Sequence, residues 1–258
     1  MSEVLRADWF DLADGVRNDM WAWLHSEFLP DLQAADGVSW VGHYDIVQQP
    51  DGPYVEGAPQ KVEADPSECM PGWQNVILSA ATSAEAFFGP GNAVDALGEK
   101  HTDKLAACEN HRYAVFMEEE VVNAPESHQS PYGMGPPPAM QLGNYNTRTP
   151  DDDYELARWY RAERFPRVAV SKGMIRGRKL LSIAGWPKHG VLWEGVELAE
   201  DEFSFEKRFV DADRGYQWPG RHVLEYVVHA PKGPHAGRLV WPKPNREQPP
   251  RKDAAALV

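Results

Sequence analysis

Hydrophobic and polar positions change their period along the chain in an order that occurs twice. An extended stretch precedes a long helical period, and three further strand-like stretches follow, the last after a second helical or charged stretch. The long helix covers about 16–35 in the first series and about 152–170 in the second. The predicted strands are 7–12, 38–47, 75–81 and 112–122, then 140–146, 174–184, 190–198 and 222–230. Each series predicts the order β-α-β-β-α-β.

The two long helical stretches share residues at one constant offset. Aligned without a gap, Trp23 falls on Trp159, an offset of 136 residues (159 minus 23). Trp, Pro and Gly seldom coincide by chance, so we interpret the series as two diverged copies of one unit. The further identical pairs at this offset are Glu27 with Glu163, Pro30 with Pro166, and Gly37 with Gly173.

Shifts in composition place the boundaries of these copies. The first repeat is expected at 1–125 and the second at 139–236, with a proline-rich linker at 126–138. Residues 50–72 carry many Pro and Gly without periodicity, so we expect an inserted loop, either a plain surface loop or one that covers a binding site. The tail at 237–258 is again rich in proline.

A sheet of this plan carries helices on one face only, so its other face requires a partner. Two copies in one chain can supply that partner internally, with their sheets packed face to face. The predicted fold class is therefore α+β, with two ferredoxin-like βαββαβ repeats that form an intrachain dimeric α+β barrel. A cavity is expected inside the barrel or under the helices.

The long helix of the second copy carries a recognisable motif. Trp159 to Pro166 reads WYRAERFP, Gly173 and a strand follow, and KHGVLWEGVEL comes later. This pattern resembles the W-Y-x-x-E-H-x-P motif of EthD-like and related dimeric α+β barrel proteins. The resemblance implies a small-molecule function, because that superfamily includes cofactor-free monooxygenases, isomerases, cyclases, lyases and haem-handling proteins. The family's His after the Glu is Phe28 in the first copy and Arg164 in the second, so its role does not transfer.

Charge and composition narrow the range of partners. The formal net charge is −13, which repels nucleic acid and anionic membrane surfaces. No apolar run of membrane-spanning length and no secretory leader appear in the sequence. Cys69 and Cys108 are too few for a disulfide framework. We expect a cytoplasmic protein with a small-molecule substrate, no nucleic-acid or membrane partner, and homo-oligomer formation as an open option.

The sharpest chemical signal is the Glu that both long helices share. With about 100° per residue in an α-helix, Glu27 falls about 20° from Met20, inside the apolar stripe, and Glu163 has the same setting. A carboxylate that faces a core needs a hydrogen bond or an ion pair, or its pKa rises. Each Glu is therefore either a structural group tied to a strand residue such as Arg178, or a general acid or base under the helix.

Basic and aromatic side chains accompany Glu163. Arg161 and Arg164 lie on the same helix and could hold a carboxylate or enolate oxygen, with a solvated helix face as the alternative. Arg178 on the following strand is a further candidate for substrate binding. Trp159 is expected to contribute to an apolar binding wall.

The strands supply a second set of candidates. On the last predicted strand, His229 and Glu225 share one face and Tyr226 lies on the other. If one face lines a cavity, His229 would be a base and Glu225 its orienting partner; otherwise His229 is a hydrogen-bonded or exposed strand residue. The remaining candidates for substrate binding are Tyr226, Tyr145, Asn144 and His43.

Motifs for several other chemistries are missing from the sequence. It contains no HExxH, no Cys/His cluster, no phosphate-binding glycine loop and no GxSxG. We therefore expect neither a metal nor a cofactor.

These features favour a cofactor-independent small-molecule enzyme of the lyase, isomerase or cyclase type. It would transfer a proton on an apolar or aromatic substrate that contains a carbonyl group. The alternatives are a non-catalytic small-molecule binding protein, a cofactor-free monooxygenase and a haem-binding protein. The second copy keeps more of the motif and is the expected location of the site. The catalytic candidates are Glu163, His229, Arg164 and Glu27.

Overall fold

A computed structural model describes residues 2–47, 61–198 and 226–243. The first half contains β1 (Val4–Asp11), α1 (Arg17–Trp23), η1 (Leu24–Phe28), α2 (Leu29–Gln33), β2 (Val38–Val47), β3 (Asn75–Ala81), α3 (Glu85–Phe88), α4 (Ala93–Lys100), α5 (Thr102–Leu105) and β4 (Glu109–Asn123). A short helix, η2 (Ser127–Gln129), lies between the halves. The second half contains β5 (Ala139–Thr147), α6 (Pro150–Trp159), η3 (Tyr160–Arg164), α7 (Phe165–Val168), β6 (Met174–Gly185), β7 (His189–Gly195), β8 (Val227–His229) and β9 (His235–Trp241).

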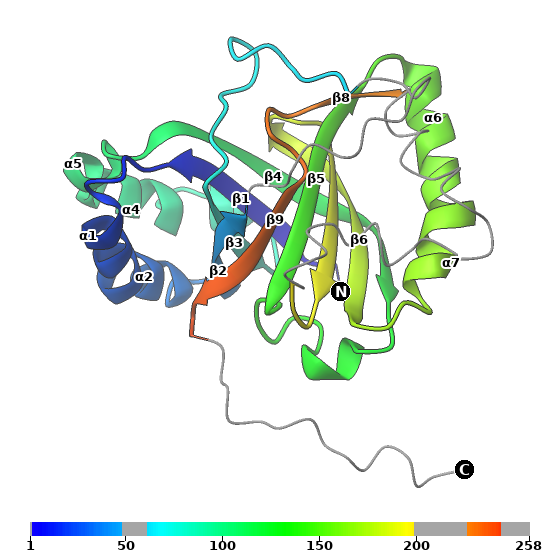
Figure 1. Cartoon of the computed structure of the whole chain (residues 1–258). Helices are drawn as coiled ribbons and strands as arrows, with labels where there is room; N and C mark the ends of the chain where they lie inside the picture. Colours follow the sequence, from blue (N-terminus) through cyan, green and yellow to red (C-terminus); the bar gives the residue numbers. More distant parts are fainter. Residues whose placement is uncertain (1, 48–60, 199–225, 244–258) are drawn as a thin grey trace, which may run out of the picture.

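The strands form one closed antiparallel barrel (Figure 1). Their order is β7-β6-β4-β1-β3-β2-β9-β5, and pairing of β5 with β7 closes the ring. Within the first half the order is β4-β1-β3-β2, and within the second it is β9-β5-β7-β6. The halves meet where β4 pairs with β6 and β2 pairs with β9. The molecule is thus a mixed α+β fold built on an eight-stranded antiparallel barrel, as the predicted class requires.

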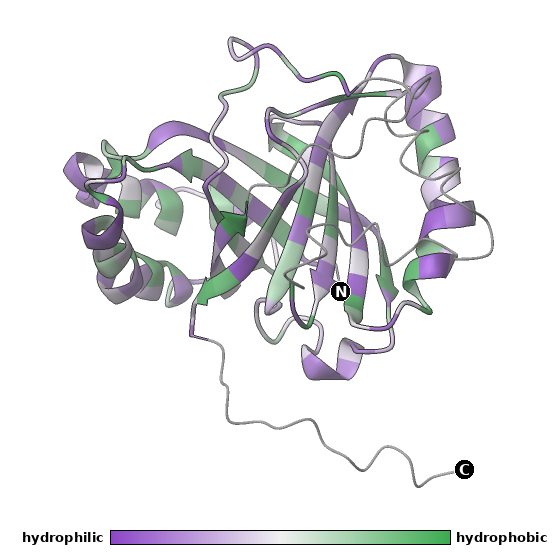
Figure 2. Cartoon of the chain, viewed as in Figure 1, coloured by the Kyte–Doolittle hydropathy of each residue, from purple (hydrophilic) through white to green (hydrophobic). Residues whose placement is uncertain are grey.

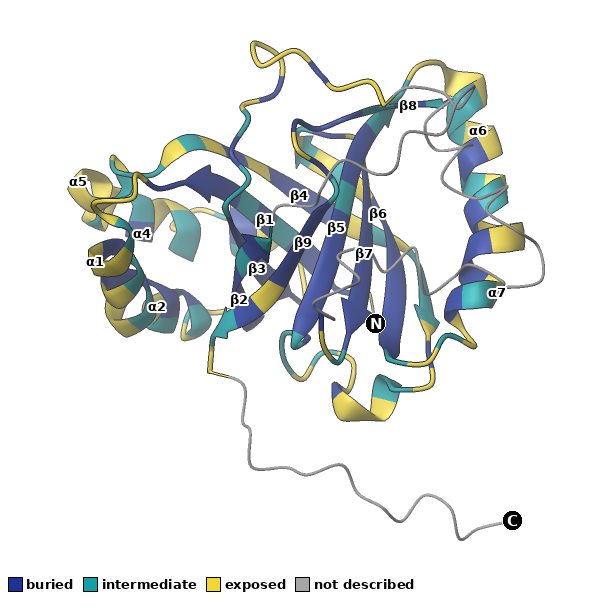
Figure 3. Cartoon of the chain, viewed as in Figure 1, coloured by how far each residue is buried: buried dark blue, intermediate teal, exposed yellow. Residues whose placement is uncertain are grey.

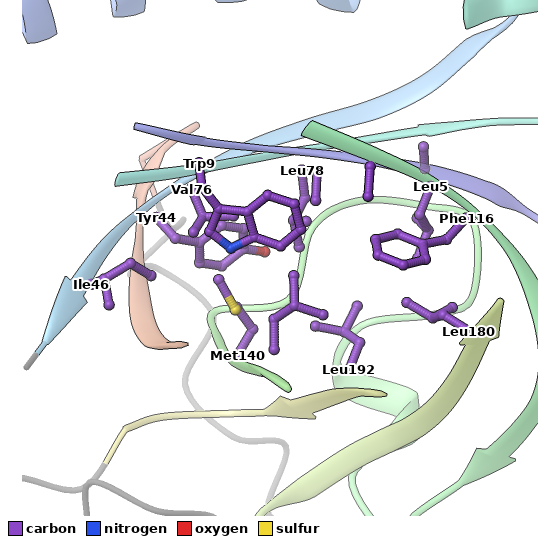
Figure 4. Close-up of a cluster of buried hydrophobic side chains, with 14 of the residues drawn as sticks. Leu5, Trp9, Tyr44, Ile46, Val76, Leu78, Phe116, Met140, Leu180 and Leu192 are labelled. Atoms are coloured by element: carbon purple, nitrogen blue, oxygen red, sulfur yellow. The ribbon is translucent and has the colours of Figure 1, made fainter. Parts of the chain in front are cut away.

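The middle of the barrel is a packed apolar core. Alternate residues of each strand point inward, and Leu5, Tyr44, Leu78, Phe116 and Leu192 are among the side chains that meet there (Figure 4). Buried positions follow the strands, whereas exposed and hydrophilic positions gather on the outward surfaces of the helices (Figures 2 and 3). Side chains therefore fill the middle of the barrel, where a cavity was one of the two expected options.

Each long helix covers the outer face of the sheet in its own half. In the first half, Trp23 and Leu29 pack against β1, β2 and β3. In the second half, Leu156 and Phe165 pack against β5, β6 and β7. No helix in the described part of the chain combines the length and the apolarity that a membrane span requires.

Both long helices contain one turn of π-helix, η1 and η3, and the two turns keep the offset of 136 residues. A π turn holds one residue more than an α turn, so every later residue is rotated relative to a regular helix. Phe28 and Arg164 are consequently buried, whereas Glu27 and Glu163 are exposed. The prediction that both glutamates face the apolar stripe is therefore wrong.

Charged side chains fill one end of the barrel interior. Arg178 pairs with Glu3 at 2.6 Å, with Glu118 at 2.9 Å and with Glu194 at 2.6 Å. Arg176 pairs with Glu194 as well and donates to a main-chain carbonyl of the predicted linker. Burying these charges is tolerated because each has a partner of opposite sign. The linker covers this end of the barrel.

The opposite end of the barrel is crossed by residues 61–73, the end of the expected insertion. The main-chain NH of His229 donates to the carbonyl oxygen of Val62, and the NH of Ala64 donates to the carbonyl oxygen of His229. At the end of the segment, Trp73 donates its main-chain NH to Asp11 at 2.9 Å. At Gly72 an added Cβ would lie 2.3 Å from the carbonyl oxygen of Asn110, so the crossing requires glycine there. Residues 48–60 of the insertion lie outside the described part.

The last strand of the barrel differs from its prediction. Of the strand expected at 222–230, the structure describes only the short β8. The last strand of the barrel is instead β9, which extends across the expected repeat boundary at 236. Pro231 and Pro234 interrupt the ladder between β8 and β9, because proline has no NH to donate. Residues 222–225, the second helix expected at 199–215 and the tail from 244 lie outside the described residues.

Candidate functional site

Three aromatic rings lie side by side on the outer face of the sheet in the half that contains α6. Tyr145 on β5 is paired in register with His189 on β7 and with His229 on β8. The ring centres of Tyr145 and His189 are 5.7 Å apart with the planes nearly parallel, and those of Tyr145 and His229 are 6.1 Å apart. All three side chains are buried.

Charged neighbours fix the His189 ring. Its Nε2 lies 2.8 Å from Asp153 Oδ1 in the first turn of α6, and its Nδ1 lies 3.0 Å from Lys179 Nζ. Lys179 donates in turn to Glu119 Oε2 at 3.2 Å. Because an ammonium only donates, Nδ1 of His189 accepts and Nε2 carries the proton that Asp153 binds. His189 is thus held in one neutral tautomer.

Burial sets the protonation of these groups. Desolvation, with Lys179 beside it, lowers the pKa of His189 to about 4. Desolvation alone would raise the pKa of Asp153. Hydrogen bonds from Lys188, Thr147 and His189 outweigh this effect and lower the pKa to about 2. At neutral pH the His–Asp pair therefore consists of a neutral imidazole and a carboxylate.

His229 differs from His189 because neither of its ring nitrogens has a hydrogen-bond partner among the described residues. Burial lowers the pKa of His229 to about 3, so its ring is neutral and offers one acceptor and one donor nitrogen. Burial and the neighbouring Tyr160 raise the pKa of Tyr145 well above its usual value. Tyr145 therefore remains a phenol, able to donate a hydrogen bond to a ligand oxygen.

This arrangement places a hydrogen-bond donor beside a hydrogen-bond acceptor. Tyr145 can donate to a carbonyl or phenolic oxygen, and the free imidazole nitrogen of His229 can accept a proton. An unpaired buried polar group is costly, so the free nitrogens of His229 would gain from a bound ligand.

The first half carries a related cluster under α1. His25 Nε2 lies 2.8 Å from His43 Nδ1, and His43 Nε2 lies 3.1 Å from Asn75 Oδ1. Trp21 donates to the same Asn75 oxygen at 2.9 Å. Desolvation, with His25 beside it, lowers the pKa of the fully buried His43 to about 3. All the ring nitrogens of His43 are engaged, which distinguishes this cluster from the one around His229.

The structure separates several of the predicted site residues. Arg161 is exposed and pairs with Glu120, whereas Arg164 is buried with its guanidinium carbon 5.2 Å from the centre of the Trp193 ring. The two arginines therefore do not line a common cavity, and Arg161 lies on a solvated helix face, the alternative stated for this pair. The i, i+3 spacing of these arginines across η3 places them on different faces, because the π turn rotates them apart.

Two further candidates lie inside the barrel. Arg178 is locked among three carboxylates there, so its expected role in binding substrate under the helix is wrong. Asn144 points to the inner face, opposite to Tyr145, because neighbouring strand residues alternate. Trp159 is half-buried with its ring centre 4.7 Å from that of Tyr160, and Tyr226 is half-buried beside β8. Glu225 lies outside the described residues.

Sequence reasoning missed His189, Lys179 and Asp153. A usable signal existed for Lys179, since the offset of 136 aligns it with His43, which the strand pattern had already marked. His189 occupies the register position of Asn75, because Leu181 pairs with His189 as Asp45 pairs with Asn75. Only the strand register identifies this position.

The described residues offer little to a metal or a haem. No group of three His, Cys, Asp or Glu side chains in the described ranges could hold a metal ion. A haem requires a flat apolar cleft beside an axial ligand. Under α6 and α7 that space holds the mutually packed rings of Tyr160, Phe165 and Trp193, so these residues do not fit the macrocycle.

The fold is that of dimeric α+β barrel proteins, and solved structures resemble it over nearly the whole chain. A proposed chlorite dismutase matches with a TM-score of 0.55 at 12% identity, covering 93% of this chain and 95% of that one. A proposed monooxygenase from Fusobacterium nucleatum gives 0.52 at 10% identity, with coverages of 92% and 91%. An anthrone oxidase-like protein gives 0.51 at 9% identity, with coverages of 93% and 91%.

No protein-family model matches the sequence, and no curated protein matches it significantly. At the identities of the three structures, the likeness establishes the fold and leaves the chemistry to the residues of this chain.

Proposed function

We propose that the chain is a cofactor-independent enzyme that transfers a proton on a small substrate with a carbonyl or phenolic oxygen. The observation that carries this proposal is the buried, neutral His229 with both ring nitrogens unpartnered among the described residues, next to Tyr145. The outer face of β5, β7 and β8 beneath α6 is the site.

The proton transfer uses these two side chains in different roles. His229 accepts the proton of the C–H bond next to the carbonyl, and the bonding electron pair passes into an enolate. Tyr145 donates a hydrogen bond to the enolate oxygen, where the negative charge develops. That charge also stabilises the imidazolium of His229, which then returns the proton to the substrate. The predicted orienting partner of His229, Glu225, lies outside the described residues and has no part in this proposal.

The positioning of these groups depends on the polar chain behind them. His189, held by Asp153 and Lys179, stacks on Tyr145 and fixes the plane of its ring. His189 acts in this proposal as a positioning residue, because both of its nitrogens are already engaged. The exposed Glu27 and Glu163 have no part in it.

Cofactor-free oxygenation is the second candidate. Deprotonation of a phenol or hydroquinone by His229 would give an electron-rich anion that can reduce molecular oxygen. Two structures that share the fold, a proposed monooxygenase and an anthrone oxidase-like protein, carry names that point to oxygen chemistry. The two reactions share the proton acceptor and differ in the consumption of oxygen.

An exchange experiment tests the proposal. The full chain is incubated in D2O with a panel of ketones, β-dicarbonyl compounds and hydroquinones, and deuterium incorporation and oxygen uptake are followed. We expect turnover or exchange with at least one class, and a loss of about 100-fold or more in His229→Gln. Tyr145→Phe should reduce the rate while the compound still binds.

His128→Gln is the matched control, because His128 lies in the exposed η2 helix away from the site. Compounds that bind without exchange, turnover or oxygen uptake would identify a binding protein and refute the proposal. Equal losses in His128→Gln and His229→Gln would do the same. A visible absorption spectrum of the purified protein tests for haem independently.

We also propose that the halves are diverged copies of one ferredoxin-like unit, with an EthD-like origin for the motif at Trp159 to Pro166. The equal offset of η1 and η3 supports this proposal, as do the equivalent strand orders of the halves. Gly37 and Gly173, which share the offset, both have a positive φ, +82° and +77°. Each glycine ends the connection between a long helix and the next strand.

A further inference from the structure

A cavity of about 390 Å³ opens at the end of the barrel that residues 61–73 cross. Its walls come from this crossing segment, through Cys69 and Met70, from β4, through Arg112 and Tyr113, and from the turn after β6, through Trp186. Its size is within the range of small-molecule sites. Neither Tyr145 nor His229 lines this cavity, so it is distinct from the site on the outer face of β5, β7 and β8.

Arg112 is a buried cation that makes no ion pair with any described residue. Its side chain is 7% exposed, and its guanidinium carbon lies 3.8 Å from the centre of the Trp9 ring. Nη2 donates to Asn144 Oδ1 at 3.1 Å, while Nε and Nη1 have no acceptor among the described residues. A buried charge that retains unsatisfied donors is unfavourable unless an anion joins it.

The acidic groups around Arg112 are engaged elsewhere. Asp11 accepts hydrogen bonds from the main-chain NH groups of Trp73 and Gln74 at 2.9 Å and from Asn110 at 2.9 Å. Its carboxylate is thereby turned to the crossing segment, and no ion pair joins it to Arg112 in the described part. Arg112 is consequently a free cation at the cavity.

The other charged residues of the cavity wall have partners or lie in solvent. Arg6 pairs with Asp8 at 2.8 Å, and His111 lies 2.9 Å from the same carboxylate. Glu68 is exposed on the rim, where solvent screens its charge. The remaining wall is apolar or aromatic and is formed mainly by Met70, Tyr113 and Trp186.

We propose that this cavity binds a small aromatic carboxylate, with the carboxylate against Arg112 and the ring between Met70 and Trp186. A charge-assisted hydrogen bond satisfies the free guanidinium donors, and the apolar wall accepts the ring. This inference does not rest on the proposed proton transfer, since neither Tyr145 nor His229 lines the cavity.

Titration of the full chain with benzoate, benzamide and acetate tests the inference by calorimetry. We expect benzoate to bind, benzamide to bind at least tenfold more weakly, and acetate to bind more weakly than benzoate because it has no ring. Arg112→Gln should weaken benzoate binding at least tenfold and abolish the preference over benzamide. Arg158→Gln is the matched control, because Arg158 is exposed on α6 and does not line the cavity; it should retain binding.

A second variant guards against misfolding of Arg112→Gln. Met70 is 46% exposed on the cavity wall, so Met70→Trp should fold and fill the space, with loss of benzoate binding while Arg112 is intact. Absence of benzoate binding in the unmodified chain would overturn the inference. Equal binding of benzoate and benzamide, or full binding by a folded Arg112→Gln or Met70→Trp, would overturn it too.

Discussion

Four of the described histidines are buried in the neutral form. His43 and His235 are fully buried, and His189 and His229 are nearly so. Desolvation disfavours the imidazolium, which lowers the pKa of His43 and His229 to about 3 and that of His235 well below its usual value. At neutral pH these rings are neutral and act as hydrogen-bonding groups. Acidification favours their protonation and therefore destabilises the fold.

Acidification from pH 7 to pH 5 should therefore reduce the free energy of unfolding. Unfolded His binds a proton near pH 6.5, whereas folded His43 and His229 do not until about pH 3, so the unfolded state gains protons over this window. Each of the two should contribute about 2 kcal/mol to the loss between pH 7 and pH 5. Asp153 loses its contribution only below its unfolded pKa of about 4, outside this window.

Urea unfolding at the two pH values measures this effect. A folded His43→Gln variant should show a smaller loss on acidification, while His128→Gln should lose as much as the unmodified chain. A free energy of unfolding that does not change between pH 7 and pH 5 would contradict the neutral burial of these rings.

At the scale of elements, the π turns explain where sequence reasoning failed. The periodicity of the sequence predicted the positions and order of the long helices. It did not predict which residues face the core, because the prediction used 3.6 residues per turn throughout. A signal was present in the first helix: Leu29 would point to solvent in a regular helix at about 180° from Met20, yet it is fully buried. One additional residue in the turn brings Leu29 to the core and moves Glu27 out.

Alanine substitutions in η1 test this assignment of faces. Phe28→Ala should lower the free energy of unfolding by about 3 kcal/mol, because it removes a buried aromatic ring. Glu27→Ala should change it by about 0.5 kcal/mol or less, as exposed substitutions do. Chemical unfolding of both variants measures these changes. A larger effect at Glu27 than at Phe28 would indicate a regular α-helix and contradict the π turn.

For the strands and the candidate site as well, the sequence pattern predicted only part of the structure. Neighbours across strands depend on the pairing register, which the pattern does not reveal. Alternation predicted most strands, and it marked Tyr145 and His229. It did not reveal that His189 lies beside Tyr145, since that neighbour depends on the register of β5 against β7. The sequence predicted that the two halves would pack into a barrel, but not which of their strands would pair. The pairing of β4 with β6 is known only from the structure.

At the scale of the whole molecule, each half completes the other. The apolar core of the barrel draws side chains from both halves, including Trp9 and Phe116 from the first and Met140 and Leu180 from the second. Two buried ion pairs cross the same boundary, because Arg178 belongs to the second half and its partners Glu3 and Glu118 to the first. This charge arrangement favours unlike halves over like ones.

Separate expression of residues 1–138 and 139–258 tests this complementarity. We expect neither half alone to show a cooperative thermal transition, and an equimolar mixture to regain one together with its antiparallel sheet. Circular dichroism and size measurement follow both. Each half folding alone as a cooperative monomer would contradict the expectation. Pairing of the first half with itself would bring Glu3 and Glu118 together without Arg178 and should be weaker than the mixture.

The two ends of the barrel are closed by segments that occur once in the chain. Residues 61–73 cross one end, where the second half has only the short connection at 186–188, and the linker covers the other. The two caps can therefore diverge independently of each other and of the barrel strands. Exchanging 61–70 for another sequence should change which ligands the cavity beside Arg112 accepts. The end of the barrel that the linker covers, with its buried charges, should stay unchanged.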